Sequence, residues 1–220
     1  MRKLEDAYLH KGLRKQLVEL LKTKGITDEK VLEAIGSIPR HFFLDSAFDR
    51  IAYEDRAFPI AADQTISQPY TVAYQTQLLK VKKGDKVLEI GTGSMYQTTI
   101  LAAMGAEVYT IERQEALASR TNQYIFKEQF PNVHFFFGDG FLGLPQYAPF
   151  DKIIITAAAP KVPEKLWEQL KVRGIMVIPV DESETAQRML RLTKKKDGLA
   201  KQESFEEFSF VPMLQGKSQG

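Results

Sequence analysis

The fold of this chain is decided by Val87-Leu88-Glu89-Ile90-Gly91-Thr92-Gly93-Ser94-Met95-Tyr96 and by residues 97–105 that follow it. An apolar run ends in an acid, a glycine-rich turn comes next, and the segment after the turn reads as a helix that ends in a glycine. Glycines let the backbone approach a ligand, and α/β sheets bind nucleotides at the carboxyl ends of their strands. The stretch therefore predicts a nucleotide-binding α/β protein.

Apolar and helical segments alternate around this stretch, which is the pattern of a doubly wound, mostly parallel sheet. We expect a helix over 70–79, a second one that runs to about Glu128, and a third over 163–170. The further strands that we expect are 107–111, 133–137, 150–156 and 174–180, with additional ones over 187–193 and 205–211. Their continuous apolar runs suit strands covered on both faces. The run Lys194-Lys195-Lys196-Asp197-Gly198 predicts a solvated hairpin tip.

The segment before residue 70 predicts two helices and a connector. Apolar residues on one stripe predict a helix over about 4–22, and Asp28 can cap a second helix that runs to about Ile35. The connector from Arg40 to Pro69 lacks clear periodicity, so it is either functional or a packed cover for one edge of the sheet. We interpret the chain as one domain that comprises an N-terminal part (1–69), a cofactor-binding core (70–182) and C-terminal strands (183–220).

Composition narrows the class of protein. The 220 residues carry a formal net charge of +2, which gives no electrostatic basis for nucleic acid or an anionic membrane as the main partner. The chain has no cysteine, so disulfides, thiolate metal sites and a cysteine nucleophile are excluded. No stretch has the length and hydrophobicity of a signal peptide or a membrane span. We expect a cytoplasmic monomer, and no metal, because the three histidines lack metal-ligand spacing.

The glycine turn also indicates which nucleotide it binds. A dinucleotide fingerprint requires a third glycine where this chain has Tyr96, and a phosphate-binding loop requires a lysine that is absent here. S-adenosylmethionine carries no phosphates. It does carry an ammonium group, a sulfonium, two ribose hydroxyls and an adenine amine. Carboxylates can accept hydrogen bonds from the ammonium, hydroxyl and amine groups, and their negative charge offsets the positive charge of the ammonium and the sulfonium. The turn is therefore more compatible with S-adenosylmethionine than with NAD.

Acids stand at three successive strand ends, where such a ligand would lie. Glu89 precedes the turn, Asp139 follows the strand over 133–137, and Glu112 lies 112 − 93 = 19 residues after Gly93. That spacing is close to the roughly 20 residues typical of a ribose-binding acid. The three positions favour a methyltransferase over a dehydrogenase and predict a Rossmann-like sheet of the S-adenosylmethionine-dependent methyltransferase type.

With these residues in view, the chain resembles the protein-L-isoaspartate (D-aspartate) O-methyltransferases, especially the bacterial ones, over nearly its whole length. The distinctive segments are Pro39-Arg40-His41-Phe42-Phe43, Ala52-Tyr53-Glu54-Asp55-Arg56, Gln64-Thr65-Ile66-Ser67-Gln68-Pro69 and Thr156-Ala157-Ala158-Ala159-Pro160 with Val162-Pro163. The resemblance implies methyl transfer from S-adenosylmethionine to the free α-carboxylate of an isoaspartyl residue in a damaged protein or peptide. The methyl ester then collapses to a succinimide without enzymatic help, which allows partial return to aspartate.

The resemblance also implies site residues. Ser67 is the residue expected near the acceptor carboxylate. A carboxylate is ionised at neutral pH and needs no general base, so we assign Ser67 to hydrogen bonding and orientation. The residues expected to contact the cofactor are Gln64, Thr65, Ile66, Ser67, Glu89, Gly91, Gly93, Ser94, Glu112, Arg113, Asp139 and Gly140.

Met95 departs from the family pattern, which has a glycine at this place in the turn. If the position needs a positive φ, a residue other than glycine costs about 1–2 kcal/mol there. The Met95 side chain could crowd the cofactor, or it could lie along the helix and fill a gap. Two alternatives to isoaspartyl repair stay open: a methyltransferase for another acceptor and, because of Met95, a binding protein that has lost its cofactor.

Overall fold

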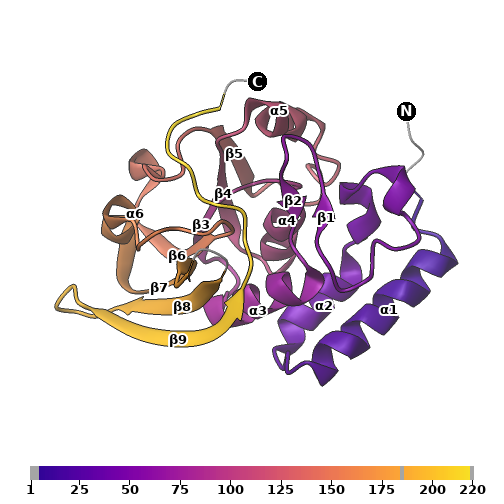
Figure 1. The fold of residues 1–220 in the computed structure, drawn as a ribbon, viewed down its shortest axis with the longest axis horizontal. Coiled ribbons are helices and arrows are strands. Elements are labelled where there is room, and N and C mark those ends of the chain that lie inside the picture. Colours follow the sequence, from indigo (N-terminus) through magenta and orange to yellow (C-terminus); the bar gives the residue numbers. More distant parts are fainter. Residues whose placement is uncertain (1–4, 184–185, 219–220) are drawn as a thin grey trace.

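A computed structural model describes residues 5–183 and 186–218. Its main sheet has the strand order β5-β4-β3-β6-β7-β8-β9 (Figure 1). The first five strands in that order are parallel, and β8 and β9 join antiparallel at one edge. The strands are β3 (Lys86–Ile90), β4 (Glu107–Glu112), β5 (Val133–Phe137), β6 (Phe150–Ile155), β7 (Leu170–Asp181), β8 (Gln187–Lys194) and β9 (Ala200–Phe208). The predicted α/β architecture is confirmed, and the hairpin tip lies between β8 and β9 as expected.

Alternate residues of each central strand pack on opposite faces of the sheet, because side chains in a strand alternate in direction. Val87 of β3 packs under α3 (Pro69–Leu79) and α4 (Tyr96–Ala103), whereas Leu88 packs with α6 (Glu164–Glu168) on the other face. The central strands β3, β6 and β7 are therefore covered on both faces, as their apolar runs predict. None of the helices in the described residues combines the length and the hydrophobicity needed to cross a membrane.

The N-terminal helices form a further layer beside α3 and α4 (Figure 1). Helix α1 spans Tyr8–Thr23 and α2 spans Glu29–Ser37, and the Asp28 carboxylate accepts a hydrogen bond from the first turn of α2 as predicted. The start of the predicted first helix, residue 4, lies outside the described residues. The connector from residue 40 to residue 69 has only short elements: 3-10 turns η1 (Arg40–Phe43) and η2 (Ser46–Phe48), and paired strands β1 (Phe58–Pro59) and β2 (Thr65–Ile66).

We expected a helix that reaches about residue 128, and this prediction of its length is wrong. Helix α5 covers Glu115–Ala118, and a 3-10 turn, η3 (Ser119–Gln123), follows it. Tyr124 then packs against Phe135, and Phe126 packs against Phe43. Residues two positions apart point to different sides of an α-helix, so both rings can reach their partners only after the helix has ended.

Two other boundaries differ from the expectation. Strand β9 covers 200–208 instead of 205–211, because its first half is an exposed, polar edge that pairs with β8 and shows no apolar pattern. Strand β7 begins at Leu170, where we expected the end of a helix, and α6 ends at Glu168. A register shift between β6 and β7 accommodates this early start.

Met95 has a left-handed conformation, with φ 70° and ψ 6°, so this position of the turn does need a positive φ. It precedes α4, and its N–H donates to the carbonyl oxygen of Thr92 at 2.8 Å. A residue with a Cβ is strained there by about 1–2 kcal/mol. The turn thus keeps the backbone geometry suited to glycine although the side chain is methionine.

Met95→Gly is expected to stabilise the protein. Relief of the left-handed strain exceeds the added flexibility of the unfolded chain, which costs about 0.5–1 kcal/mol. The net gain of roughly 0.5–1 kcal/mol corresponds to a rise in Tm of about 2 °C, measured by thermal unfolding. Met104→Gly is the control, since Met104 ends the same helix with φ −77° and has no such strain. A Tm of Met95→Gly below that of the wild type contradicts the strain argument.

Candidate active site

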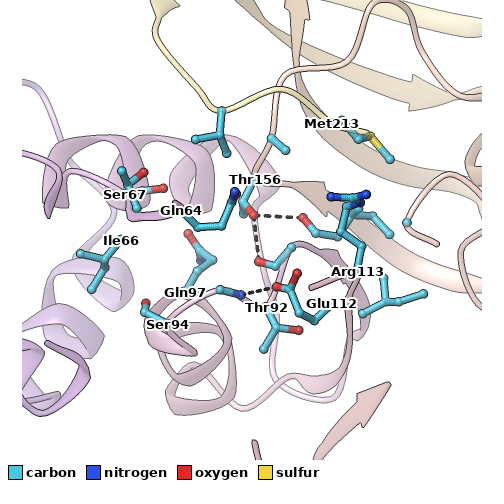
Figure 2. A pocket seen from close by; sticks show the side chains of 18 of the residues that line it. Gln64, Ile66, Ser67, Thr92, Ser94, Gln97, Glu112, Arg113, Thr156 and Met213 are labelled. Atoms are coloured by element: carbon cyan, nitrogen blue, oxygen red, sulfur yellow. Dashed lines mark hydrogen bonds between the residues drawn. The ribbon is translucent and has the colours of Figure 1, made fainter. Parts of the chain in front are cut away.

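A pocket opens at the carboxyl ends of β3, β4 and β6, between the connector and the C-terminal segment (Figure 2). Figure 2 shows Ser67 and Gln64 on one side and Glu112 and Arg113 on the other, with Thr156 between them. The polar lining residues are Gln64, Thr65, Ser67, Thr92, Ser94, Gln97, Glu112, Arg113 and Thr156. Parallel strands end at the same edge of a sheet, so residues far apart in the sequence meet there.

Backbone hydrogen bonds hold the glycine turn to the neighbouring strands. Gly91 donates its N–H to the carbonyl oxygen of Ile111 at 2.9 Å, and Gly93 donates to the Glu112 carboxylate at 2.9 Å. A Cβ on Gly91 would lie 2.5 Å from the Thr156 hydroxyl oxygen, which itself donates to carbonyl oxygens of Ile90 and Gly91. Glycine is therefore required at position 91 for the turn and β6 to come this close.

Glu112 is fixed by the backbone and still has acceptor capacity. Besides Gly93, the N–H of Gln114 donates to its carboxylate at 2.8 Å, and the residue is only 5% exposed. Each carboxylate oxygen has a second lone pair, so two hydroxyls can still bind to the same group. This arrangement suits the paired ribose hydroxyls of a nucleoside.

Glu89 lies under the turn and does not line the pocket. Its carboxylate is fully buried between β3 and α4 and accepts a hydrogen bond from Thr98 at 2.5 Å. Its Oε1 atom has no hydrogen-bond partner among the described residues. Burial raises the pKa of Glu89 to about 8, so the side chain is mostly protonated at neutral pH. A neutral acid can donate a hydrogen bond, which an ionised carboxylate cannot.

The buried guanidinium of Arg40 holds the connector together. Its Nε donates to the carbonyl oxygen of Ala52 at 2.9 Å, and one terminal nitrogen donates to that of Ser67 at 2.9 Å. The guanidinium also lies over the ring of Tyr96, 4.9 Å from its centroid. Ser67 and Tyr96 both line the pocket, Ser67 from the connector and Tyr96 from the start of α4, so Arg40 joins the connector to the helix.

Burial lowers the pKa of Arg40 to about 10, which leaves the group charged at neutral pH. Arg40 has no exposed surface, and a buried charge is tolerated only when hydrogen bonds and nearby π electrons compensate for lost hydration. Its second terminal nitrogen has no hydrogen-bond partner among the described residues. The connector is thus built around one charged side chain.

The C-terminal segment, residues 211–218, forms the outer wall of the pocket. It leaves β9 and runs across the carboxyl edge of the sheet toward α5 (Figure 1). Met213 donates its N–H to the carbonyl oxygen of Ala158, and Ser218 donates to that of Arg113 at 2.8 Å. Residues Val211, Pro212, Met213 and Leu214 contribute apolar surface to the pocket. No feature of the sequence singled out this segment as part of the site.

The structure brings ten of the twelve expected cofactor residues into the lining of one pocket: Gln64, Thr65, Ile66, Ser67, Gly91, Gly93, Ser94, Glu112, Arg113 and Gly140. It places the other two outside that lining. Glu89 is buried beneath the turn, and the carboxylate of Asp139 accepts hydrogen bonds from the N–H groups of Phe141 and Gly216, both at 2.9 Å. Contact of either acid with the cofactor stays a prediction.

Some lining residues were missed from the sequence but carried a usable signal. Thr156 and Ala157 follow the end of β6, where strand ends converge on a ligand, and they belong to a segment that resembles the family. Gln97 lies one residue inside α4, and its buried Oε1 atom has no partner among the described residues. Met95 is not among the lining residues, so its side chain does not narrow the pocket.

The pocket has the donor and acceptor set that S-adenosylmethionine needs. The Oε1 of Gln97 is a buried acceptor without a partner, which an ammonium group can satisfy. Glu112 can accept from ribose hydroxyls, and Ile90, Ile111 and Met213 offer apolar surface to an adenine ring. These residues fit the cofactor.

Asp6, His10 and His41 form a side-chain cluster whose ligand atoms lie within 4.8 Å of one another. Arg14 donates two hydrogen bonds of 2.9 Å to the Asp6 carboxylate. One ring nitrogen of His41 faces a backbone carbonyl oxygen and must donate to it, which leaves the other to accept from Tyr53 at 2.8 Å. These hydrogen bonds link α1 to the connector through Asp6 and His41, while Nδ1 of His10 is buried and has no hydrogen-bond partner among the described residues.

Comparison with known proteins identifies relatives over almost the full chain. Residues 12–218 match the family model described as Protein-L-isoaspartate(D-aspartate) O-methyltransferase. A protein-L-isoaspartate O-methyltransferase of Christiangramia forsetii is 54% identical over 215 residues, which are 98% of this chain and 100% of the relative. One of Flavobacterium psychrophilum has the same identity and coverage. A Plasmodium falciparum protein-L-isoaspartate O-methyltransferase, solved with S-adenosyl-L-homocysteine, has a TM-score of 0.78 at 26% identity, covering 91% of this chain and 98% of that one.

Glu89→Gln is expected to change how stability depends on pH in the cofactor-free protein. The unfolded acid ionises near pH 4.5 and the folded one near pH 8, so wild-type stability falls as the pH rises between these values. The neutral amide avoids this loss. The variant should gain up to about 4 kcal/mol over the wild type between pH 5 and pH 8, measured by denaturant unfolding. The exposed Glu33→Gln is the control, and a pH-independent gain would contradict the prediction.

Arg40→Lys is expected to destabilise the protein although the charge is kept. A lysine ammonium cannot reproduce the planar fork that reaches both Ala52 and Ser67, so one buried carbonyl loses its donor. We expect a loss of about 2 kcal/mol and a fall in Tm of ~4–8 °C. Arg50→Lys, at an exposed position of the same connector, should leave Tm unchanged. An unchanged Tm in Arg40→Lys would show that the fork is not needed.

Proposed function

The chain belongs to the protein-L-isoaspartate (D-aspartate) O-methyltransferase family, and we propose here how its own residues perform the family reaction. The protein transfers a methyl group from S-adenosylmethionine to the free α-carboxylate of L-isoaspartyl residues in damaged proteins and peptides. When bound, the cofactor supplies an electrophilic methyl group on a positively charged sulfonium. The observation that carries the assignment of roles is the position of Ser67, which lines both the cofactor pocket and a second, adjoining groove.

Ser67 is proposed to orient the acceptor carboxylate. It stands between β2 and the start of α3, with its carbonyl oxygen held by Arg40, so its hydroxyl is presented from a fixed backbone. The N-terminal end of α3 begins two residues later and adds a partial positive charge that favours a carboxylate. Because a carboxylate is already ionised at neutral pH, alignment is the main requirement, and alignment can supply about 7–11 kcal/mol.

The cofactor is proposed to bind to the glycine turn and the residues next to it. Glu112 accepts from the ribose hydroxyls, Gln97 receives the ammonium group, and the C-terminal segment excludes water from the pocket. The three parts of the chain then divide the task. The connector carries Ser67 and part of the cofactor pocket, the core from residue 70 to residue 182 carries most of the cofactor contacts, and residues 211–218 close the site. A cytoplasmic monomer stays a prediction from the sequence.

Methyl transfer should distinguish an isoaspartyl peptide from its aspartyl twin. Labelled methyl from S-adenosylmethionine is expected on the isoaspartyl peptide alone, because only that peptide presents a free α-carboxylate at the damaged residue. Methyl release after base treatment measures the ester. Label on both peptides, or on neither, would contradict the acceptor assignment.

Ser67→Ala is expected to lower kcat/KM for the isoaspartyl peptide by about 10- to 100-fold, since a misaligned acceptor loses much of the benefit of orientation. Calorimetric binding of S-adenosylhomocysteine should change little, since Glu112 and the turn remain. Ser46→Ala, at an exposed position of η2, is the matched control. Equal losses of cofactor affinity and of kcat/KM would instead place Ser67 on the cofactor side alone.

A further inference from the structure

A second groove of about 750 Å³ adjoins the cofactor pocket. Thr65, Ser67, Thr156 and Val211 line both hollows, so the two meet at the residue proposed to hold the acceptor. The groove extends from this junction along the start of α3 and along residues 206–211 at the end of β9. A chain that delivers an isoaspartyl residue to Ser67 must leave the site through an opening of this kind.

A β-bulge aims Glu206 into the groove. The register of β9 against β8 advances from Leu190↔Ser204 to Arg188↔Glu207, which is two residues on β8 and three on β9. Such an extra residue re-aims the side chains of the bulged strand. Glu206 consequently faces α3, where its carboxylate accepts a hydrogen bond of 3.1 Å from the hydroxyl of Tyr70.

Glu206 gives the groove an uncompensated negative charge. Among the described residues that line the groove, the charged ones are Glu206 and Glu207. Arg188 neutralises Glu207 at 2.7 Å, whereas Glu206 forms no ion pair with any described residue. Burial and the neighbouring carboxylate raise the pKa of Tyr70 to about 12, so the phenol stays neutral and does not offset this charge. Lys24, which lies over the Tyr70 ring at 5.2 Å from its centroid, is paired with Asp55.

We propose that this groove holds the peptide segment next to the isoaspartate and that Glu206 selects segments with a lysine or arginine there. The inference rests on the proposed function, since Ser67 fixes where the damaged residue lies. An extended peptide advances about 3.3 Å per residue, so the first few residues on one side of the isoaspartate pass Glu206. A cationic side chain at one of these positions gains a carboxylate partner, and an acidic one meets repulsion.

The test uses matched isoaspartyl peptides with lysine, alanine or glutamate at each of the three positions on either side of the damaged residue. Wild-type kcat/KM at low ionic strength should favour lysine over glutamate about fivefold at one position at least. The preference should shrink at about 1 M salt, where screening acts within ~3 Å. Glu206→Gln keeps an acceptor for Tyr70 and should abolish the preference. Glu203→Gln makes the same charge change on β9 outside the groove and should retain it.

The outcomes separate this inference from the proposed function. Methylation of all isoaspartyl peptides without a lysine preference, or with a preference that survives in Glu206→Gln, overturns the role of Glu206 and leaves the methyltransferase assignment intact. Methylation of no isoaspartyl peptide, with S-adenosylhomocysteine still bound, contradicts the proposed function itself. A preference lost in Glu206→Gln and kept in Glu203→Gln establishes Glu206 as the specificity residue.

Discussion

The tight turn between β3 and α4 is the constraint on which the rest of the structure depends. The chain must reverse at the carboxyl edge of a parallel sheet, where a Cβ on Gly91 would lie only 2.5 Å from the Thr156 hydroxyl oxygen. The N–H groups of this turn are satisfied by the neighbouring strand, through Ile111 and Glu112. The turn therefore fixes the position of Glu112, opens space above the sheet for a nucleoside and sets where α4 begins.

A second requirement is that the connector, residues 40–69, keeps a fixed position relative to this turn. The connector has little regular structure of its own, and backbone carbonyls in such a segment need other donors. Arg40 supplies them from the interior, reaching carbonyl oxygens of Ala52 and Ser67 while it lies on the ring of Tyr96. Tyr96 occupies the place of the third glycine in a dinucleotide fingerprint. The residue that argues against NAD thus packs against the guanidinium that holds the connector.

The cofactor pocket and the second groove meet at Ser67 and Thr156. This junction lies between the site proposed for the cofactor and the site proposed for the peptide. The cofactor pocket is closed by the C-terminal segment, whose backbone bonds to Ala158 and Arg113. The groove on the other side stays open toward the edge strand β9 and carries the charge of Glu206. In the function and specificity that we propose, the pocket encloses a small, constant ligand while the groove admits a polypeptide of variable sequence, as repair of many different proteins requires.

The sequence alone determined the α/β architecture and, through its resemblance to a family, most of the residues expected at the pocket. Strands with continuous apolar runs, a glycine turn and acids at strand ends are local signals, whereas the positive φ of Met95 was left open and was settled by the structure. Only the tertiary structure decided the burial of Glu89, the three-way contact of Arg40 and the wall formed by residues 211–214. Each of these depends on packing between segments distant in the chain. Local patterns record which residues can form an element, whereas burial and long-range pairing exist only after the elements have packed.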